Sequence, residues 1–190
     1  MRSQRLRLQA FRATEYFSSW AAEGSPKEIA DARQRYDGRI SISETKGKGW
    51  GLFALRDFAP GEKVMAAKAL RVTAHRDAHS IQTGVNRHAL MDLPARFVNH
   101  SCDANLGIAD NDFGAFDFHA LRPILKSEEL TWDYETAEYE IMGFDLCLCG
   151  SPKCRKRLKG FRESGAVIQQ LYGDYIAGYL KNLQGSRTSS

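Results

Sequence analysis

The chain has 190 residues, with 27 lysines and arginines against 23 aspartates and glutamates, 43% hydrophobic residues and four cysteines. This length fits one domain, or one domain with a small appendage, and the composition excludes disordered, collagen-like and disulfide-scaffold chains. No apolar run reaches the roughly 18 to 20 residues of a membrane-spanning helix, and no secretory cleavage pattern follows the first residue. We therefore expect an intracellular protein, nuclear or cytoplasmic, without a membrane partner.

Residues 1–36 are predicted to form a helical extension of two short helices. Apolar positions recur along the first stretch, and a Gly-Ser-Pro break at 24–26 interrupts the pattern before it resumes. Four arginines precede the first acidic residue, Glu15. An organelle transit peptide is therefore a minor alternative to a basic helix that packs on the domain.

Residues 37–145 are predicted to form short strands separated by turns. Ile40 and Ile42 alternate with polar residues, and Pro60 with Gly61 marks a tight turn. Further strand-like segments lie at 52–55, 70–72, 80–82, 113–118 and 129–134. Because these strands do not alternate with long helices, we expect a mostly β fold of small sheets with peripheral helices, and not a doubly wound parallel sheet.

Residues 163–184 are predicted to form an amphipathic helix. The apolar residues of this segment recur at intervals of three and four, as they do on one face of a helix. They are Val167, Ile168, Leu171, Tyr172, Tyr175, Ile176, Tyr179, Leu180 and Leu183. We expect this face to pack on the domain, with a partner-binding or dimer helix as the alternative, and residues 185–190 to form a disordered tail.

The four cysteines indicate a metal site. Cys147, Cys149 and Cys154 lie on a Gly/Pro-containing turn, where their thiolates can converge on one metal ion. Cys102 would complete a closed four-cysteine zinc site, which would be structural because it leaves no position for a substrate. The alternative is that Cys102 is a buried free thiol and that a histidine or water is the fourth ligand. The four-cysteine site requires the chain after residue 146 to fold back onto the loop around Cys102.

Four motifs follow one another along the chain. They are Gly49-Trp50-Gly51, then Asn99-His100-Ser101-Cys102 within 96–105, then Glu129-Leu130-Thr131-Trp132-Asp133-Tyr134, then the cysteines of 147–154. In this order they closely resemble the SET domain protein-lysine methyltransferases, and the last motif resembles the post-SET zinc segment of that family. The resemblance covers about residues 38 to 160. It implies a β-clip-like SET domain over 37–145 with a threaded C-terminal segment, a post-SET zinc segment over 146–162 and flanking N- and C-terminal helices.

The resemblance also implies S-adenosylmethionine as methyl donor and gives individual residues a role. The residues that match its donor-binding positions are Gly49, Trp50, Gly51, Asn99, His100, Tyr134 and Leu148. Tyr134 matches the catalytic tyrosine of the family. Trp132 takes the aromatic position that limits how many methyl groups fit the lysine pocket, with plain core packing as the alternative. Ala104 replaces a usual proline, which should alter loop rigidity more than chemistry.

The expected reaction is methyl transfer to the lysine side chain of a histone or another basic protein. The unperturbed lysine pKa is about 10.4, so the site must favour the neutral amine. A dry aromatic channel and the neighbouring sulfonium cation of the donor would both lower that pKa. The alternative function is a non-catalytic SET-like module that binds a peptide or chromatin.

Two oppositely charged segments follow each other near the expected site. Residues 128–145 contain seven acidic residues and no lysine or arginine, whereas 153–162 contain six basic residues and no acid. An acidic lip would attract a lysine-rich tail, and the basic segment would lie near DNA or a nucleosome. The alternative is that the two segments are solvated or neutralise each other.

Overall fold

The computed structural model describes residues 24–76, 80–141 and 146–185. The helix expected before residue 24, the transit-peptide alternative and the tail after residue 185 lie outside these residues. None of the described helices is both long and apolar enough to cross a membrane.

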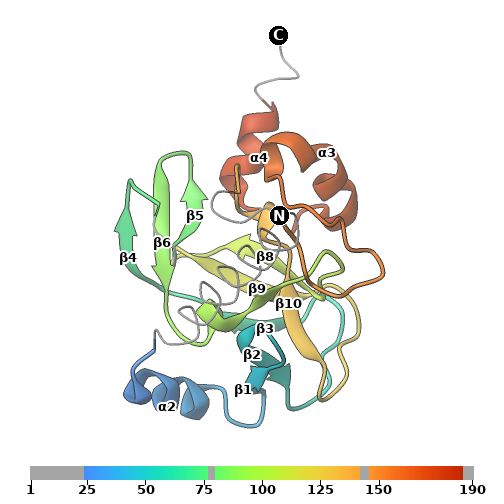
Figure 1. Ribbon diagram of the computed structural model, residues 1–190. Coiled ribbons are helices and arrows are strands. Elements are labelled where there is room, and N and C mark those ends of the chain that lie inside the picture. Colours follow the sequence, from blue (N-terminus) through green and yellow to red (C-terminus); the bar gives the residue numbers. More distant parts are fainter. Residues whose placement is uncertain (1–23, 77–79, 142–145, 186–190) are drawn as a thin grey trace, which may run out of the picture.

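The described strands form two sheets (Figure 1). The larger sheet has the order β1 (Ile40–Thr45), β2 (Gly49–Ala54), β10 (Glu129–Trp132), β8 (Leu106–Asp110), β9 (Phe116–Ala120), β3 (Lys63–Ala66), and β7 (Asn99–His100) pairs with β10. The smaller sheet has the order β4 (Ala69–Thr73), β6 (Arg87–Met91), β5 (Ile81–Gly84). The prediction of a mostly β fold built from small sheets is confirmed.

Strand β10 is the central element for the site. It runs antiparallel to β2 and parallel to both β7 and β8. Thr131 lies opposite Asn99, and Trp132 lies opposite His100. The buried side chain of Asn105 extends this pairing, because it accepts a hydrogen bond from the Thr131 N–H at 2.9 Å and donates to the Glu129 carbonyl at 2.8 Å. Motifs that are distant in the sequence thus lie side by side.

The helices are short and peripheral. Helix α2 (Pro26–Arg35) begins at a capping box formed by Ser25 and Glu28, which satisfies free N–H groups at the helix start. This helix lies where the sequence predicts one after the Gly-Ser-Pro break. Two single-turn 3₁₀ helices, η1 (Ala95–Phe97) and η2 (Tyr134–Thr136), flank the motif strands.

The C-terminal segment differs from its prediction. The single helix expected over 163–184 is wrong, because the chain forms α3 (Phe161–Tyr172) and α4 (Gly178–Gly185). Helix α3 ends at Gly173, whose φ of 55° is in the left-handed region that glycine adopts easily. Not all residues of the predicted stripe face the core, since Val167 and Leu171 are 49% and 55% exposed.

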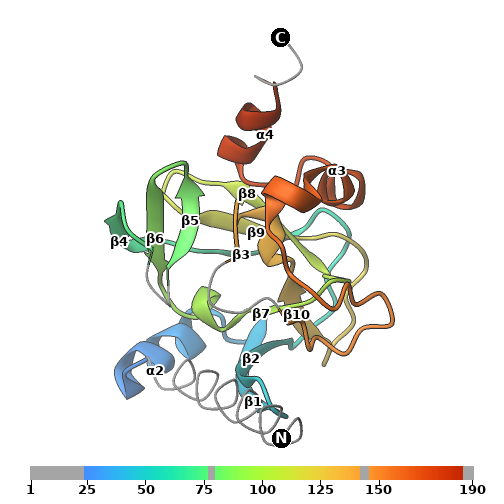
Figure 2. The same cartoon turned by 45° about the horizontal axis from the view of Figure 1, so that its top comes forward.

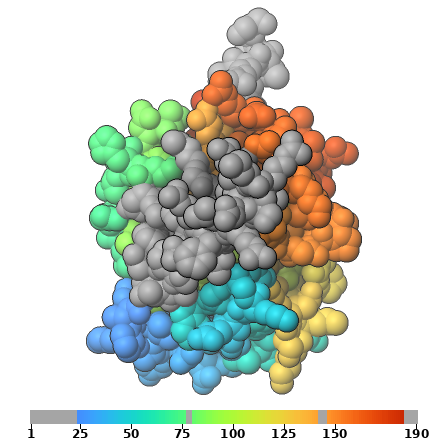
Figure 3. Space-filling view, viewed as in Figure 1, coloured from blue at the N-terminus to red at the C-terminus, as the bar shows by residue number. Residues whose placement is uncertain are grey.

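The C-terminal helices nevertheless share the hydrophobic core of the sheets. The largest fully buried side chains are Trp132, Phe58, Phe116, Phe118, Leu52, Leu106, Ile108, Ile124, Leu130, Ile168, Ile176 and Leu180. Figure 2 shows α3 and α4 close to the ends of β8 and β9. In the space-filling view, the green small sheet and the orange C-terminal segment lie on opposite sides of one face (Figure 3).

Candidate active site and metal centre

The glycine-rich segment at residues 46–51, here called the glycine loop, allows close approach between β2 and β7. A Cβ atom on Gly51 would lie 2.5 Å from Thr45 Cγ2 and 3.0 Å from Asn99 Nδ2, and real Cβ atoms do not approach other atoms at the first of these distances. A side chain at this position would therefore displace its neighbours. The predicted donor-binding residues Gly49, Trp50 and Gly51 are thus held against Asn99.

Asn99 joins three of the motifs. Its Nδ2 donates to the Trp50 carbonyl at 3.1 Å and to Glu129 Oε1 at 3.0 Å. Glu129 also forms an ion pair with Lys48 of the glycine loop at 2.6 Å. The Trp50 ring packs on Phe97, with 6.1 Å between ring centroids. One amide side chain therefore fixes the glycine loop relative to β10.

Tyr134 lies directly after β10, beside the predicted donor residues. Its hydroxyl donates to the Val98 carbonyl at 3.1 Å, and burial raises the pKa of Tyr134 above its usual value. The phenol therefore stays neutral and acts as a hydrogen-bond donor at physiological pH. The His100 ring lies edge-on to it with 5.2 Å between centroids, and His100 Nδ1 accepts from the Tyr134 backbone N–H at 3.3 Å.

Trp132 connects Tyr134 to the hydrophobic core. Its indole is 1% exposed and contacts the rings of Phe116 and Phe118 at centroid distances of 6.3 Å and 5.6 Å. The distance from the indole to the Tyr134 ring is 5.2 Å. Core packing accounts for most of these contacts, and the contact with Tyr134 puts the indole beside the predicted catalytic residue.

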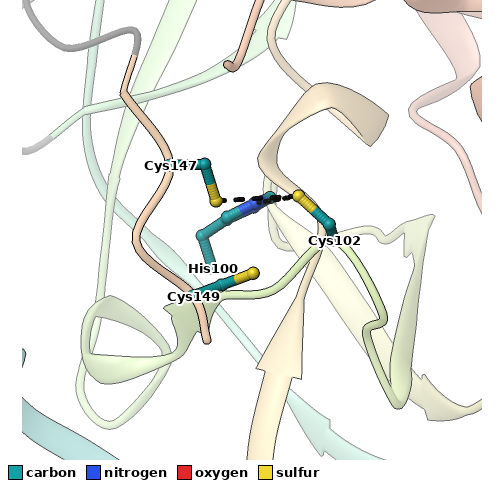
Figure 4. Close-up of side chains that lie close together, drawn as sticks. All are labelled: His100, Cys102, Cys147 and Cys149. Atoms are coloured by element: carbon teal, nitrogen blue, oxygen red, sulfur yellow. Dashed lines mark hydrogen bonds between the residues drawn. The ribbon is translucent and has the colours of Figure 1, made fainter. Parts of the chain in front are cut away.

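Three of the four cysteines converge, together with His100. Cys102, Cys147, Cys149 and His100 bring their ligand atoms within 4.8 Å of one another. Figure 4 shows the three sulfur atoms pointing towards a common centre. The Cys102 and Cys147 sulfurs are 3.6 Å apart, close to the separation of about 3.8 Å between two thiolates 2.3 Å from one tetrahedral zinc ion. The residues thus fit a zinc ion, and the chain after residue 146 folds back onto the Cys102 loop.

His100 and Cys154 are the two candidates for the fourth ligand. His100 Nδ1 accepts a hydrogen bond from the Tyr134 N–H, which favours the tautomer with its proton on Nε2, the nitrogen that lies 3.3 Å from Cys102 Sγ. A protonated nitrogen donates to a thiolate but does not bind a metal. Cys154 lies beside the group and contacts the Cys147 carbonyl through its sulfur at 3.6 Å. The ligand atom of His100 lies within 4.8 Å of those of the other three residues, and Cys154 is not in that group, whereas the hydrogen bond to His100 Nδ1 favours Cys154; both residues therefore stay candidates.

The surroundings of Cys102 stabilise its thiolate, the form that binds metals. The hydrogen bond from Cys147 is the largest cause that lowers the pKa of the Cys102 thiol to about 3, and hydrogen bonds from His100 and from the Arg155 N–H add to it.

Leu148, a predicted donor-binding residue, lies between two of the cysteines. Its apolar side chain is 68% exposed.

A buried ionic network flanks Tyr134. The sequence analysis allowed the acidic and basic segments to neutralise each other, but it did not predict that these charges are buried. Asp133 and Glu135, on either side of Tyr134, are 0% and 1% exposed. Arg155 pairs with both, through Nη1 to Asp133 at 2.7 Å and through Nη2 to Glu135 at 2.8 Å. The only sequence signal was the position of the two acids beside the predicted catalytic residue.

Most of the described carboxylates in 128–145 do not form the expected acidic lip, because they pair with basic residues. Besides the pairs with Arg155, Glu129 pairs with Lys48, Glu138 with Arg76, Glu128 with Arg122 and Glu140 with Arg162. Asp145 lies outside the described residues. The acidic and basic segments thus partly neutralise each other, through Arg155 and Arg162, as the alternative interpretation held.

Comparison with known families identifies the motifs. Residues 49–135 match the model of the SET domain family. The chain contains a SET domain. A histone-lysine N-methyltransferase of Fusarium mangiferae, H3 lysine-9 specific, is 43% identical over 83 residues, which cover 36% of this chain and 24% of the relative. One of Saccharomyces cerevisiae, H3 lysine-4 specific, is 28% identical over 158 residues, 71% of this chain and 15% of the relative.

A solved structure has the same fold as this SET domain. The structure of KRYPTONITE in complex with mCHG DNA and SAH aligns with a TM-score of 0.52 at 23% identity, over 66% of this chain and 30% of that one. The predicted SET fold is therefore confirmed. The chain spans 30% of this structure and at most 24% of the two relatives above, so it corresponds to one part of those longer proteins.

Proposed function

We propose that this SET domain is an S-adenosylmethionine-dependent protein-lysine N-methyltransferase that acts on a histone or another basic protein. The observation that carries the proposal is the convergence of the glycine loop, Asn99, His100 and Tyr134 around strand β10. The similarity to histone-lysine N-methyltransferases supports both the reaction and a nuclear location inside the cell.

The donor would supply an electrophilic methyl group on its sulfonium sulfur. The residues that we assign to its binding are Gly49, Trp50, Gly51, Asn99, His100, Tyr134 and Leu148. The tight packing at Gly51 supports this assignment, because it places backbone and not a side chain next to Asn99. Leu148, exposed beside the cysteines, would cover the adenine ring.

The chain's own residues would position the lysine amine and keep it neutral. We assign the catalytic role to Tyr134, whose hydroxyl donates to the Val98 carbonyl and keeps a lone pair for the amine. The buried indole of Trp132 would exclude water, which lowers the pKa of the substrate amine by desolvation. Orientation of a neutral amine for in-line attack would then be the main contribution to the rate.

Zinc would hold the post-SET segment in place. We assign Cys102, Cys147, Cys149 and Cys154 as its ligands, supported by the 3.6 Å distance between the first two sulfurs and by the hydrogen bond that His100 Nδ1 accepts from the Tyr134 N–H. Four thiolates leave no open position, so the ion would fix residues 146–162 against the Cys102 loop and take no part in methyl transfer.

A second partner is proposed for the basic segment 153–162. Arg155 is engaged with buried acids, whereas Lys153 and Lys159 form surface pairs with Asp103 and Glu163 and keep side chains that are 72% and 56% exposed. These lysines would contact the phosphates of DNA or of a nucleosome that carries the histone substrate. The structural neighbour solved with DNA is consistent with such a contact.

One experiment tests the proposed function. Zinc-loaded protein is titrated with S-adenosylmethionine by calorimetry, and then incubated with labelled donor, core histones and a peptide array. We expect donor binding and label on lysine, located by mass spectrometry. Peptide binding without donor binding would favour the non-catalytic module instead.

A further inference from the structure

The C-terminal helices lie outside the matched SET region, yet they contact the segment that carries Tyr134. The N–H of Phe161 donates to the Glu138 carbonyl, and the N–H of Ala177 donates to the Thr136 carbonyl, each at 2.9 Å. The Tyr179 hydroxyl donates to the Ala137 carbonyl at 2.5 Å. The residues after β10 are therefore held by the C-terminal extension.

The contact of Tyr172, the last residue of α3, is different in kind. Its hydroxyl donates to Asp133 Oδ2 at 3.0 Å, whereas the other contacts reach backbone carbonyls. Tyr172 is 6% exposed, and burial raises its pKa, so the hydroxyl keeps its proton. A hydrogen bond to a buried carboxylate is stronger than one between neutral groups.

Asp133 determines the position of the turn that carries Tyr134. Its Oδ1 accepts from the Glu135 N–H at 3.2 Å and caps the turn η2. The same oxygen lies 3.7 Å from His100 Nδ1, the atom that accepts from the Tyr134 N–H. A shift of Asp133 would therefore move the backbone of Tyr134 and its contact with His100.

Arg155 links the cysteine cluster to the same carboxylate, that of Asp133. Its Nη1 pairs with Asp133 Oδ2, the oxygen that Tyr172 also contacts, and its backbone N–H donates to Cys102 Sγ at 3.4 Å. Asp133 is thus the point where the cysteine cluster and helix α3 both reach the active-site turn. Loss of either contact leaves this buried charge with fewer partners.

We propose that Tyr172 is a positioning residue for methyl transfer. It holds Asp133 together with Arg155, and through Asp133 it fixes the turn that presents Tyr134 to the substrate amine. Tyr172 itself does not touch the substrate. The inference rests on the proposed function, and it makes helix α3 part of the active site's support.

Two tyrosine variants of the same extension test the inference. Tyr172→Phe removes only the hydroxyl that reaches Asp133, and Tyr179→Phe removes a hydroxyl that reaches the same segment at a backbone carbonyl. We expect Tyr172→Phe to lower kcat about tenfold with little change in the KM for donor, because Tyr134 loses its alignment. Tyr179→Phe should keep kcat within about twofold of the unmodified protein.

A second measurement decides the inference without any turnover. Amide hydrogen exchange of Tyr134 and Glu135, followed by NMR in the absence of donor, should accelerate in Tyr172→Phe and stay unchanged in Tyr179→Phe. Equal losses of kcat in the two variants, or unchanged exchange in Tyr172→Phe, would overturn the inference. If the unmodified protein transfers no methyl group, the proposed function fails, and the exchange comparison still tests Tyr172.

Discussion

At the scale of single residues, the neighbours of Tyr134 come from three separate parts of the chain. Val98 and His100 belong to the loop and strand before β8, Trp132 is the last residue of β10, and Asp133 is fixed by residues beyond position 150. Together these neighbours hold three parts of the tyrosine in position: its hydroxyl, its ring and its backbone. The hydroxyl can be removed without disturbing the other two.

We predict that Tyr134→Phe removes most methyl transfer and leaves donor binding intact. The ring contacts with His100 and Trp132 remain, so the fold should lose only about 1 kcal/mol from the hydrogen bond to Val98. The rate should fall about 100-fold, since a positioned polar group at the reacting centre is lost. Single-turnover assays with labelled donor, together with calorimetry, measure the two quantities.

Tyr36→Phe is a matched control for this variant. The Tyr36 hydroxyl also donates to a backbone carbonyl, that of Ala66 at 2.9 Å, but it lies outside the assigned site. The Tyr36→Phe variant should show a similar small loss of stability and should keep full activity. Normal turnover by Tyr134→Phe, or weakened donor binding in it, would count against the assigned role.

At the scale of elements, alternation in the sequence predicted β1 but not β6 or β8. Ile40 and Ile42 are buried in β1 as expected. Strand β8, Leu-Gly-Ile-Ala-Asp, contains glycine and alanine, which have weak strand preference. It is a strand because it pairs with β9 along its whole length, and long-range pairing of this kind is not visible in a local pattern.

In the candidate site, too, the local sequence predicted some contacts, and others depend on the tertiary structure. The number and spacing of the cysteines predicted that Cys102 meets Cys147, Cys149 and Cys154, and the first two of these do lie beside it. The burial of Asp133 and Glu135 could not be predicted, because charged residues are usually exposed unless they are paired. Their partner Arg155 reaches them only when the chain after residue 146 folds back, so its place depends on tertiary structure.

Zinc binding provides a prediction for the cysteine cluster. Cys154→Ser should release zinc more readily than the unmodified protein, whereas His100→Asn should retain it, because we assign the fourth ligand position to Cys154 and not to His100. Zinc content is measured by atomic emission after dialysis against a chelator. Cys147→Ser, which removes a central ligand, is the control that should lose zinc.

The reverse result would change the ligand set. Retention of zinc by Cys154→Ser together with its loss from His100→Asn would show that the site contains three cysteines and one histidine. A structural zinc ion contributes to the folding free energy, so each variant that loses the ion should also unfold at lower temperature.

At the scale of the whole molecule, the C-terminal helices and the sheets form one core. Ile168 of α3 and Leu180 of α4 are both 0% exposed, and they belong to the same cluster of buried residues as Leu52 and Phe118 of the large sheet. A Cβ atom added to Gly107 of β8 would lie 2.5 Å from Tyr175 Cβ and 2.6 Å from Cγ of the Tyr175 ring. The described parts of the chain are therefore expected to unfold together.

Two substitutions on α3 test this expectation. Ile168→Ala should lower the free energy of unfolding by about 2 to 5 kcal/mol, because it leaves a cavity in the shared core. Leu171→Ala, at a position that is 55% exposed, should change it by about 0.5 kcal/mol or less. Urea denaturation, followed by circular dichroism and by tryptophan fluorescence, should give coincident transitions in both variants.

The activity of the same two variants links core packing to catalysis. Tyr172 lies four residues after Ile168, one helical turn further along the same face of α3, so a loosened helix also weakens the hydrogen bond from Tyr172 to Asp133. Ile168→Ala should therefore lose methyl transfer at temperatures where it remains folded, and Leu171→Ala should not. Full activity of folded Ile168→Ala, or an early separate transition for α3, would mean that the C-terminal helices are an independent unit.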